Sequence, residues 1–159
     1  MHTAPLRAHH VLPAGGWDAG HETDRVWIDF DRRHRRRLLL RTEGGRDVLL
    51  DLPHAARLRD GDGLALDGGG VVRVRARPEP LLEIHAHDPA GLVRIAWHLG
   101  NRHLPVQPPG SRIRIRADHV IEGTVRALGG HVAAVEAPFD PEGGAYAGGH
   151  GHAHDHDHD

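Results

Sequence analysis

The sequence predicts an α+β fold made of two folded units and a histidine-rich end. Three patterns indicate this fold. Residues 25–76 contain short runs of alternating apolar and polar side chains between Gly and Asp clusters, which is typical of strands and turns. From residue 88 onward, two stretches repeat apolar residues every three or four positions, as amphipathic helices do. Beyond residue 139 this periodicity stops.

The first unit, residues 1–78, is predicted to be an all-β domain. Val26, Ile28 and Phe30 alternate with other residues, as a half-buried strand requires. Further strands are expected on either side of Gly- and Asp-containing turns, at residues 37–41, 47–52, 64–66 and 71–75. Several short strands of this kind favour a small sandwich or barrel. The segment that contains His9 and His10 is expected to be disordered.

The second unit, residues 79–147, follows a linker predicted at residues 77–80. Asp88 and Asp118 are suited to cap the first turns of two helices. The apolar stripes of these helices are Leu92, Ile95, Ala96 and Leu99, and Ile121, Val125 and Leu128. Strands are predicted at residues 81–85, 112–116 and 131–135. If residues 104–107 supply a brief further strand, the order becomes β-α-β-β-α-β, which is the ferredoxin-like pattern.

Composition narrows the classes of protein to which the chain can belong. Apolar residues make up 38% of the 159 residues, which supports a packed core. Two domains of about 70 residues would each be only marginally stable and would gain stability from dimerisation. The formal net charge of −2 argues against nucleic-acid binding. No apolar run is long enough for a signal peptide or a membrane span, so we expect a cytoplasmic protein without a membrane partner. No catalytic motif is present, and we expect no enzymatic activity.

The last ten residues place a histidine at every second position. Imidazole nitrogens bind Ni²⁺, Zn²⁺ and Cu²⁺, and the interleaved Gly, Ala and Asp residues cannot build a core. Residues 148–159 are therefore expected to form a disordered, metal-binding tail. A purification tag is the alternative, but tags are usually consecutive histidines, and these alternate with other residues. The chain has no cysteine, so any metal ligands must be nitrogen or oxygen atoms.

Two more histidines flank the end of the first predicted helix. His98 and His103 are five positions apart, about 140° around an ideal helix, so one helix cannot bring both to a single ion. If His103 binds a metal, its partner must be His119 at the start of the second helix, the tail, or a second subunit. Alternatively, His98 is a surface residue and His103 is a helix-end cation favoured by the helix dipole.

Four motifs in order resemble the UreE family of urease accessory proteins. They are residues 98–105, Asp118-His119-Val120, residues 138–146 and the histidine-rich end. The N-terminal half is similar too, at residues 31–37, 49–53 and 60–62. The resemblance covers most of the chain, although residues 1–24 carry little of it.

This resemblance implies a nickel metallochaperone, which is a cytoplasmic homodimer that delivers Ni²⁺ to the urease apoprotein together with an accessory GTPase complex. It implies that His103 lies at the dimer interface, where each subunit offers one imidazole to a shared ion, and that His119 is an auxiliary ligand. Some relatives have another histidine where this chain has Ala117. The expected metal ligands are His103, His119, His98, His150, His152, His154, His156 and His158. Zn²⁺ and Cu²⁺ are expected to bind to them in vitro as well.

Other interpretations remain open at this point. A passive nickel or zinc store would use the tail alone. Six arginines within residues 31–41 are typical of a solvated strand edge, and they could also form a docking surface for an acidic partner. His85 and His87 share one face of a predicted strand with Asp88 opposite, and we interpret them as ordinary surface residues.

Overall fold

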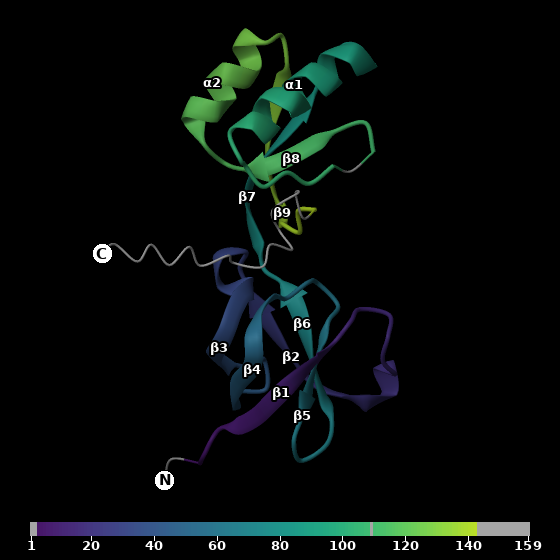
Figure 1. The fold of residues 1–159 in the computed structure, drawn as a ribbon, viewed down its shortest axis with the longest axis vertical. Coiled ribbons are helices and arrows are strands. Elements are labelled where there is room, and N and C mark those ends of the chain that lie inside the picture. The colour runs from purple at the N-terminus through teal and green to yellow at the C-terminus, as the bar shows by residue number, and fades with distance from the viewer. Residues whose placement is uncertain (1–2, 109, 143–159) are drawn as a thin grey trace, which may run out of the picture.

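The computed structural model describes residues 3–108 and 110–142, which form two units, each built on its own sheet (Figure 1). The first contains a six-stranded sheet, and the second contains a three-stranded sheet with two helices. The predicted α+β class is confirmed. The tail histidines lie outside the described residues. No helix within the described ranges is long and apolar enough to cross a membrane.

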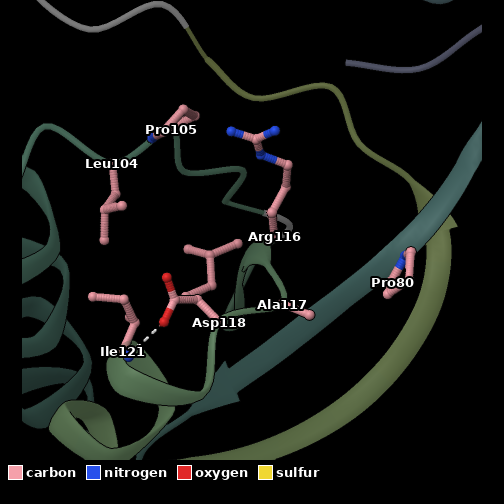
Figure 2. Close-up of a pocket in the computed structure, with 8 residues that line it drawn as sticks. Pro80, Leu104, Pro105, Arg116, Ala117, Asp118 and Ile121 are labelled. Atoms are coloured by element: carbon pink, nitrogen blue, oxygen red, sulfur yellow. Dashed lines mark hydrogen bonds between the residues drawn. The ribbon is translucent and has the colours of Figure 1, made fainter. Parts of the chain in front are cut away.

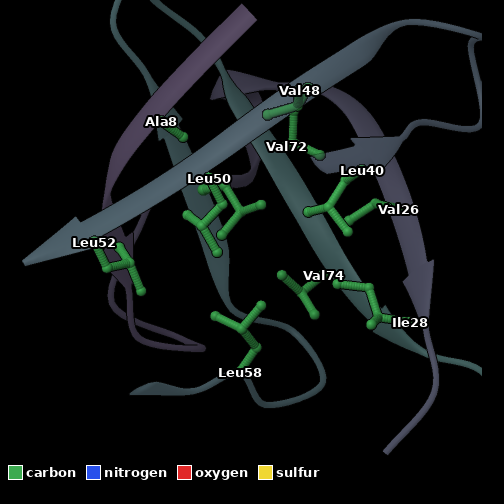
Figure 3. Packing of buried hydrophobic residues seen from close by; sticks show 11 residues of the cluster. Ala8, Val26, Ile28, Leu40, Val48, Leu50, Leu52, Leu58, Val72 and Val74 are labelled. Carbon is green, nitrogen blue, oxygen red and sulfur yellow. The ribbon is translucent and has the colours of Figure 1, made fainter. Parts of the chain in front are cut away.

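The six-stranded sheet has the order β2-β6-β5-β1-β4-β3. Its strands are β1 (Leu6–Leu12), β2 (Glu22–Ile28), β3 (His34–Arg41), β4 (Asp47–Arg57), β5 (Gly63–Leu66) and β6 (Val71–Ala76). Two of its pairings, β1 with β4 and β2 with β6, are parallel, and the others are antiparallel. The sheet curls around one core, into which apolar side chains from the six strands and Leu58 point (Figure 3).

Strand β1 was not predicted, and the expected disorder around His9 is wrong. β1 lies inside the sheet, between β5 and β4. The His9 ring is anchored at both nitrogens, by Nδ1 to the carbonyl oxygen of Asp51 at 3.0 Å and by Nε2 to the carboxylate of Asp67 at 3.1 Å. The apolar residues of the segment do not alternate regularly beyond Ala8, and its parallel pairing with β4 joins positions about forty residues apart. A local pattern does not reveal such a pairing.

The second unit contains β7 (Pro78–His85), α1 (Pro89–Asn101), β8 (Ile113–Arg116), α2 (His119–Ala127) and β9 (His131–Pro138). Its antiparallel sheet has the order β8-β7-β9. The predicted linker at residues 77–80 is wrong, because residues 78–80 begin β7 and pair with β9. At these positions β7 has no partner strand on the β8 side, which begins its pairing at Leu81. Pro78 and Pro80 have no backbone N–H to donate, and this is tolerated because this part of β7 is at the edge of the sheet.

The strand expected at residues 104–107 is reduced to a single bridge. Gln107 pairs with Arg114 of β8 through two backbone hydrogen bonds of 2.9 and 2.7 Å. This bridge lies on the free side of β8, where the second strand of a ferredoxin-like sheet belongs. Pro105 and Pro108 have no N–H to donate, so a longer ladder cannot form.

Both helices begin at the predicted caps. Asp88 accepts a hydrogen bond from the N–H of Gly91 at 2.6 Å, and Asp118 accepts from Val120 and Ile121 at 2.9 and 3.1 Å. The predicted apolar stripes face the sheet and form one core with it. The core residues are Leu82, Ile84, Ile95, Leu99, Ile113, Ile115, Ile121 and Val125.

A buried arginine joins the two units. Arg33 lies in a 3₁₀ turn (Asp31–Arg33) before β3, and its side chain is fully buried. Its guanidinium donates to the carbonyl oxygen of Phe139 and to the carboxylate of Asp140, 3.3 Å away. Beside it, the rings of Phe30 and Phe139 meet edge to face at 5.1 Å. The interpretation of residues 31–41 as a solvated strand edge therefore holds only in part. β3 is an edge strand, as that interpretation requires, but Arg33 of the same segment is buried.

Replacing Arg33 by Met should lower the free energy of unfolding by about 3 kcal/mol, because the buried carbonyl of Phe139 and the carboxylate of Asp140 lose a charged donor. Urea denaturation measures this change. Arg35→Met is the matched control, since Arg35 is exposed on β3, and its effect should stay within about 0.5 kcal/mol. Equal effects of the two substitutions would show that the buried guanidinium does not hold the units together.

Candidate metal site

His103 lies in a left-handed backbone conformation at the end of α1. Its φ is 55°, and it is the one non-glycine residue with a positive φ among residues 3–108 and 110–142. The N–H of His103 donates to the carbonyl oxygen of Gly100 at 3.0 Å. The N–H of Leu104 donates to the carbonyl oxygen of Leu99 at 3.4 Å. These two bonds define a Schellman motif, which places the exposed His103 at the position that usually holds glycine.

Helix α2 ends in the same motif with the favoured residue. Gly129 has a φ of 86°, and its N–H bonds to the carbonyl of Arg126 at 3.0 Å. The N–H of Gly130 bonds to the carbonyl of Val125, also at 3.0 Å. A side chain at a left-handed position costs about 1 kcal/mol or more. The backbone at His103 therefore carries this conformational strain, whereas the backbone at Gly129 does not. Strain of this kind often occurs at functional sites, so it makes His103 a candidate functional residue.

An exposed apolar face of α1 leads to His103. Val93 and Trp97 are one turn apart and remain 68% and 64% exposed, although both are large hydrophobic residues. Gly100 follows on the same face, and nothing lies within 4 Å of the position that a Cβ would occupy there. The buried stripe of α1 faces the sheet, so this second apolar face has no covering element within the described part of the chain. Its exposure indicates an interaction surface.

A groove of about 1080 Å³ runs beside His103 between the two units. Val93, Ala96 and Gly100 of α1 line it on one side, and Phe30, Arg57 and Arg59 of the first unit line it on another. The Arg57 guanidinium lies 4.3 Å from the centre of the Phe30 ring. Burial, and then the positive charge of Arg33, lower the pKa of Arg57, but an arginine still stays charged at neutral pH. The groove is therefore apolar along the helix and cationic along the sheet.

His119 is exposed on the first turn of α2, next to the capping residue Asp118. A smaller cavity of about 340 Å³ is lined by chain neighbours of His119 and His103 but by neither histidine itself (Figure 2). Leu104 and Pro105, which follow His103, line one side of this cavity, and Asp118 lines the other. The structure thus brings the neighbours of the two predicted ligands to one hollow. Ala117 also lines it.

His98 takes a different position. It is half-buried on α1, and its ring meets that of Trp97 edge to face at 5.1 Å. Over the described ranges, no group of three or more His, Asp or Glu side chains could hold a metal ion. His98, His103 and His119 therefore do not form a complete centre in one copy of the chain. His150, His152, His154, His156 and His158 lie outside the described residues.

Sequence reasoning missed one group of histidines. His85 of β7 is paired with His131 of β9, and their rings stack at 4.9 Å with planes 24° apart. His87 Nε2 lies 3.0 Å from His131 Nε2. The interpretation of His85 and His87 as ordinary surface residues did not include this contact, because the register between β7 and β9 is not visible in either segment alone.

Comparison with known proteins agrees with this architecture. The sequence model of the UreE urease accessory protein N-terminal domain matches residues 4–77, and that of the C-terminal domain matches residues 79–159. The two matched regions correspond to the two sheets and together span almost the whole chain. The chain therefore belongs to the UreE family of urease accessory proteins, and the resemblance found in the sequence is confirmed.

Three relatives named urease accessory protein UreE illustrate the similarity. That of Bradyrhizobium sp. (strain ORS 278) is 56% identical over 142 residues, which are 89% of this chain and 67% of the relative. That of Rhodopseudomonas palustris (strain HaA2) is 59% identical over 127 residues, 80% of this chain and 59% of the relative. That of Rhodobacter capsulatus is 43% identical over 143 residues, 90% and 88% of the two chains. The chain thus spans about two thirds or less of the first two relatives.

Replacing His103 by Gly should raise the free energy of unfolding by about 1 kcal/mol, because glycine relieves the left-handed strain. The mirror substitution Gly129→His should lower it by a similar amount, since the motif is the same and nothing lies within 4 Å of the added Cβ. Urea denaturation of both variants tests the pair. If His103→Gly gave no gain while Gly129→His gave the loss, the His103 side chain would be compensating its own strain.

Proposed function

We propose that this protein is a nickel metallochaperone, which binds Ni²⁺ through interface and tail histidines and delivers it to apo-urease during assembly of the active site. The observation that carries the proposal is His103, held under strain at the end of an exposed apolar helix face. The relatives' shared name, urease accessory protein, supports the destination of the ion. The proposed place of delivery is the cytoplasm, with the accessory GTPase complex as co-partner.

The exposed face of α1 supports a homodimer. Burying Val93 and Trp97 against a second copy would stabilise the pair by roughly 2 kcal/mol for each side chain. Two-fold symmetry brings the same patch of each copy together, so a residue near the axis meets its own counterpart. His103 lies at the end of this face, and a dimer of this kind would place two imidazoles on one ion.

A two-imidazole site suits the transfer of an ion. Only nitrogen donors are supplied, and the remaining coordination positions stay open to water or to an incoming ligand. Ligand exchange can then proceed one bond at a time. His119 would serve as an auxiliary ligand; in support, its neighbour Asp118 and the residues after His103, Leu104 and Pro105, line the same small cavity. The five tail histidines would collect ions and raise their local concentration.

Ligand type alone does not select nickel. The stability of nitrogen complexes rises from Ni²⁺ to Cu²⁺, so the protein should bind Cu²⁺ at least as tightly in vitro, and Zn²⁺ as well. Selection of Ni²⁺ would then depend on metal supply and on docking to the urease apoprotein and the GTPase complex. The cationic side of the groove is a surface on which an acidic partner could be oriented.

Replacing Trp97 by Gln should raise the dissociation constant of the dimer about 100-fold, as expected for an aromatic residue in the centre of an interface. The Ni²⁺ ion shared by two His103 residues should be lost with it. Sedimentation and nickel titration measure the two effects in a background with Gln at the five tail positions. Leu39→Gln is the control, because Leu39 is 56% exposed on the other unit. A Trp97→Gln dimer of unchanged affinity would refute the proposed interface.

Deleting residues 148–159 separates delivery from storage. A chaperone should keep one ion per dimer and most of its ability to activate urease, because the shared His103 site remains. A passive store should lose its metal capacity and its effect on urease together. Adding His103→Ala to the truncated chain should abolish the remaining ion and the activation. Equilibrium dialysis and urease activation in a reconstituted mixture measure both outcomes.

A further inference from the structure

The exposed imidazoles of His85 and His87 both contact that of His131 at one end of the three-stranded sheet. This is the end at which α1 begins. His131 opens β9, and its ring stacks on that of His85, the cross-strand partner in β7. The ring of His87 meets the same His131 ring edge-on, with centroids 4.5 Å apart and planes at 87°. The two Nε2 atoms of His87 and His131 are 3.0 Å apart.

This group is separate from the surroundings of His103. It lies next to Asp88, the capping residue before α1, whereas His103 follows the last turn of the same helix. A helix of 13 residues is about 20 Å long, so the two locations lie at opposite ends of α1. An ion bound here would not be the ion proposed to be shared between two His103 residues.

We propose that His87 and His131 form a second cation site, which holds one divalent ion of the nickel, copper or zinc class between their Nε2 atoms. Metal–imidazole bonds are about 2.0–2.1 Å long. Two such bonds at a right angle put the nitrogens about 2.9 Å apart, and tetrahedral bonds put them about 3.4 Å apart. The observed 3.0 Å falls between these values. Small ring rotations therefore suffice to turn both lone pairs toward one ion.

The surroundings leave the two imidazoles available to an ion. Among the described residues, none of the three rings is paired with a carboxylate. The Asp88 carboxylate accepts from the N–H of Gly91 at 2.6 Å as a helix cap. Since no group of three or more ligands is formed in the described chain, the remaining coordination positions would be filled by water. The proposed site is thus open to solvent, and its two protein ligands would bind the ion weakly.

His85 acts as a positioning residue in this arrangement. Its ring lies nearly parallel to that of His131, at a stacking separation, and the antiparallel register fixes both residues on paired strands. Stacking restricts the rotation of the His131 ring and so keeps its Nε2 beside His87. A phenyl ring at position 85 can supply this contact without any nitrogen.

The test uses the full-length chain with Gln at the five tail positions and His103→Gly, so that neither of the other proposed sites contributes. Cu²⁺ is the probe, because it binds nitrogen ligands most tightly in its series. We expect substoichiometric Cu²⁺ to broaden the imidazole NMR signals of His87 and His131 before those of other histidines. His87→Ala or His131→Ala should each weaken binding of the first equivalent at least tenfold.

Two further variants set the limits of the interpretation. His54→Ala, at an exposed histidine of β4, should leave the titration unchanged. His85→Phe should keep the affinity within about threefold, whereas His85→Ala should weaken it, as a stacking role requires. The proposal is overturned if Cu²⁺ broadens all exposed histidines alike, or if the affinity does not change in His87→Ala and His131→Ala. Because His103 is already replaced, the outcome is independent of the proposed delivery function.

Discussion

The buried guanidinium of Arg33 is the constraint on which the arrangement of the two units depends. It comes from the first unit, and its hydrogen bonds end on Phe139 and Asp140, just after the last strand of the second. The two terminal nitrogens of the guanidinium are matched by Asp140 and Phe139, whereas its buried Nε has no hydrogen-bond partner among the described residues. Because these two hydrogen bonds are directional and join residues of different units, they fix the relative position of the units. The Phe30–Phe139 pair excludes water around it. The groove beside His103 follows from this contact, because its walls belong to different units.

Within that frame, the end of α1 presents His103 in a defined way. The Schellman hydrogen bonds hold the backbone, and Leu99 and Leu104 anchor it in the core on either side. The imidazole is therefore projected from a rigid support and not from a loose loop. The comparison with Gly129 shows that the fold itself does not require a side chain at this position. The strain at His103 is therefore an observation that supports its proposed role as a metal ligand.

Local features of the fold were predictable from sequence, and long-range ones were not. The helix starts at Asp88 and Asp118 and the apolar stripes that follow them depend on neighbours three or four residues away, so the pattern reveals them. β1 depends on partners about forty residues distant, and the strand at residues 78–80 depends on β9. The proline-rich composition of residues 78–80 suggested a linker because it gives no sign of the partner strand.

The same distinction applies to the candidate sites. His103 and His119 were identified by motif and by position at helix ends, and the structure adds the cavity between their neighbours and the left-handed backbone. The contact of His87 with His131 joins residues 44 positions apart, and it depends on the pairing of β7 with β9 and on the bend after β7 that holds His87. Strand alternation predicted a shared face for His85 and His87, but β7 ends at His85 and His87 lies in the bend that follows. The pattern of one segment also cannot show which residue of β9 lies opposite.

The two proposed cation sites have a common physical character that fits a carrier. Each uses two imidazoles, and each leaves most of the coordination sphere open. A closed shell of four or more protein ligands would bind more tightly, but release would then require several bonds to break before a new one formed. With two protein bonds, an incoming ligand can bind first and each imidazole can leave in turn. The absence of cysteine acts in the same direction, because thiolates would hold these ions more firmly than neutral nitrogen does. For a protein that transfers its ion, a few exchangeable ligands therefore favour release more than a larger number of protein ligands would.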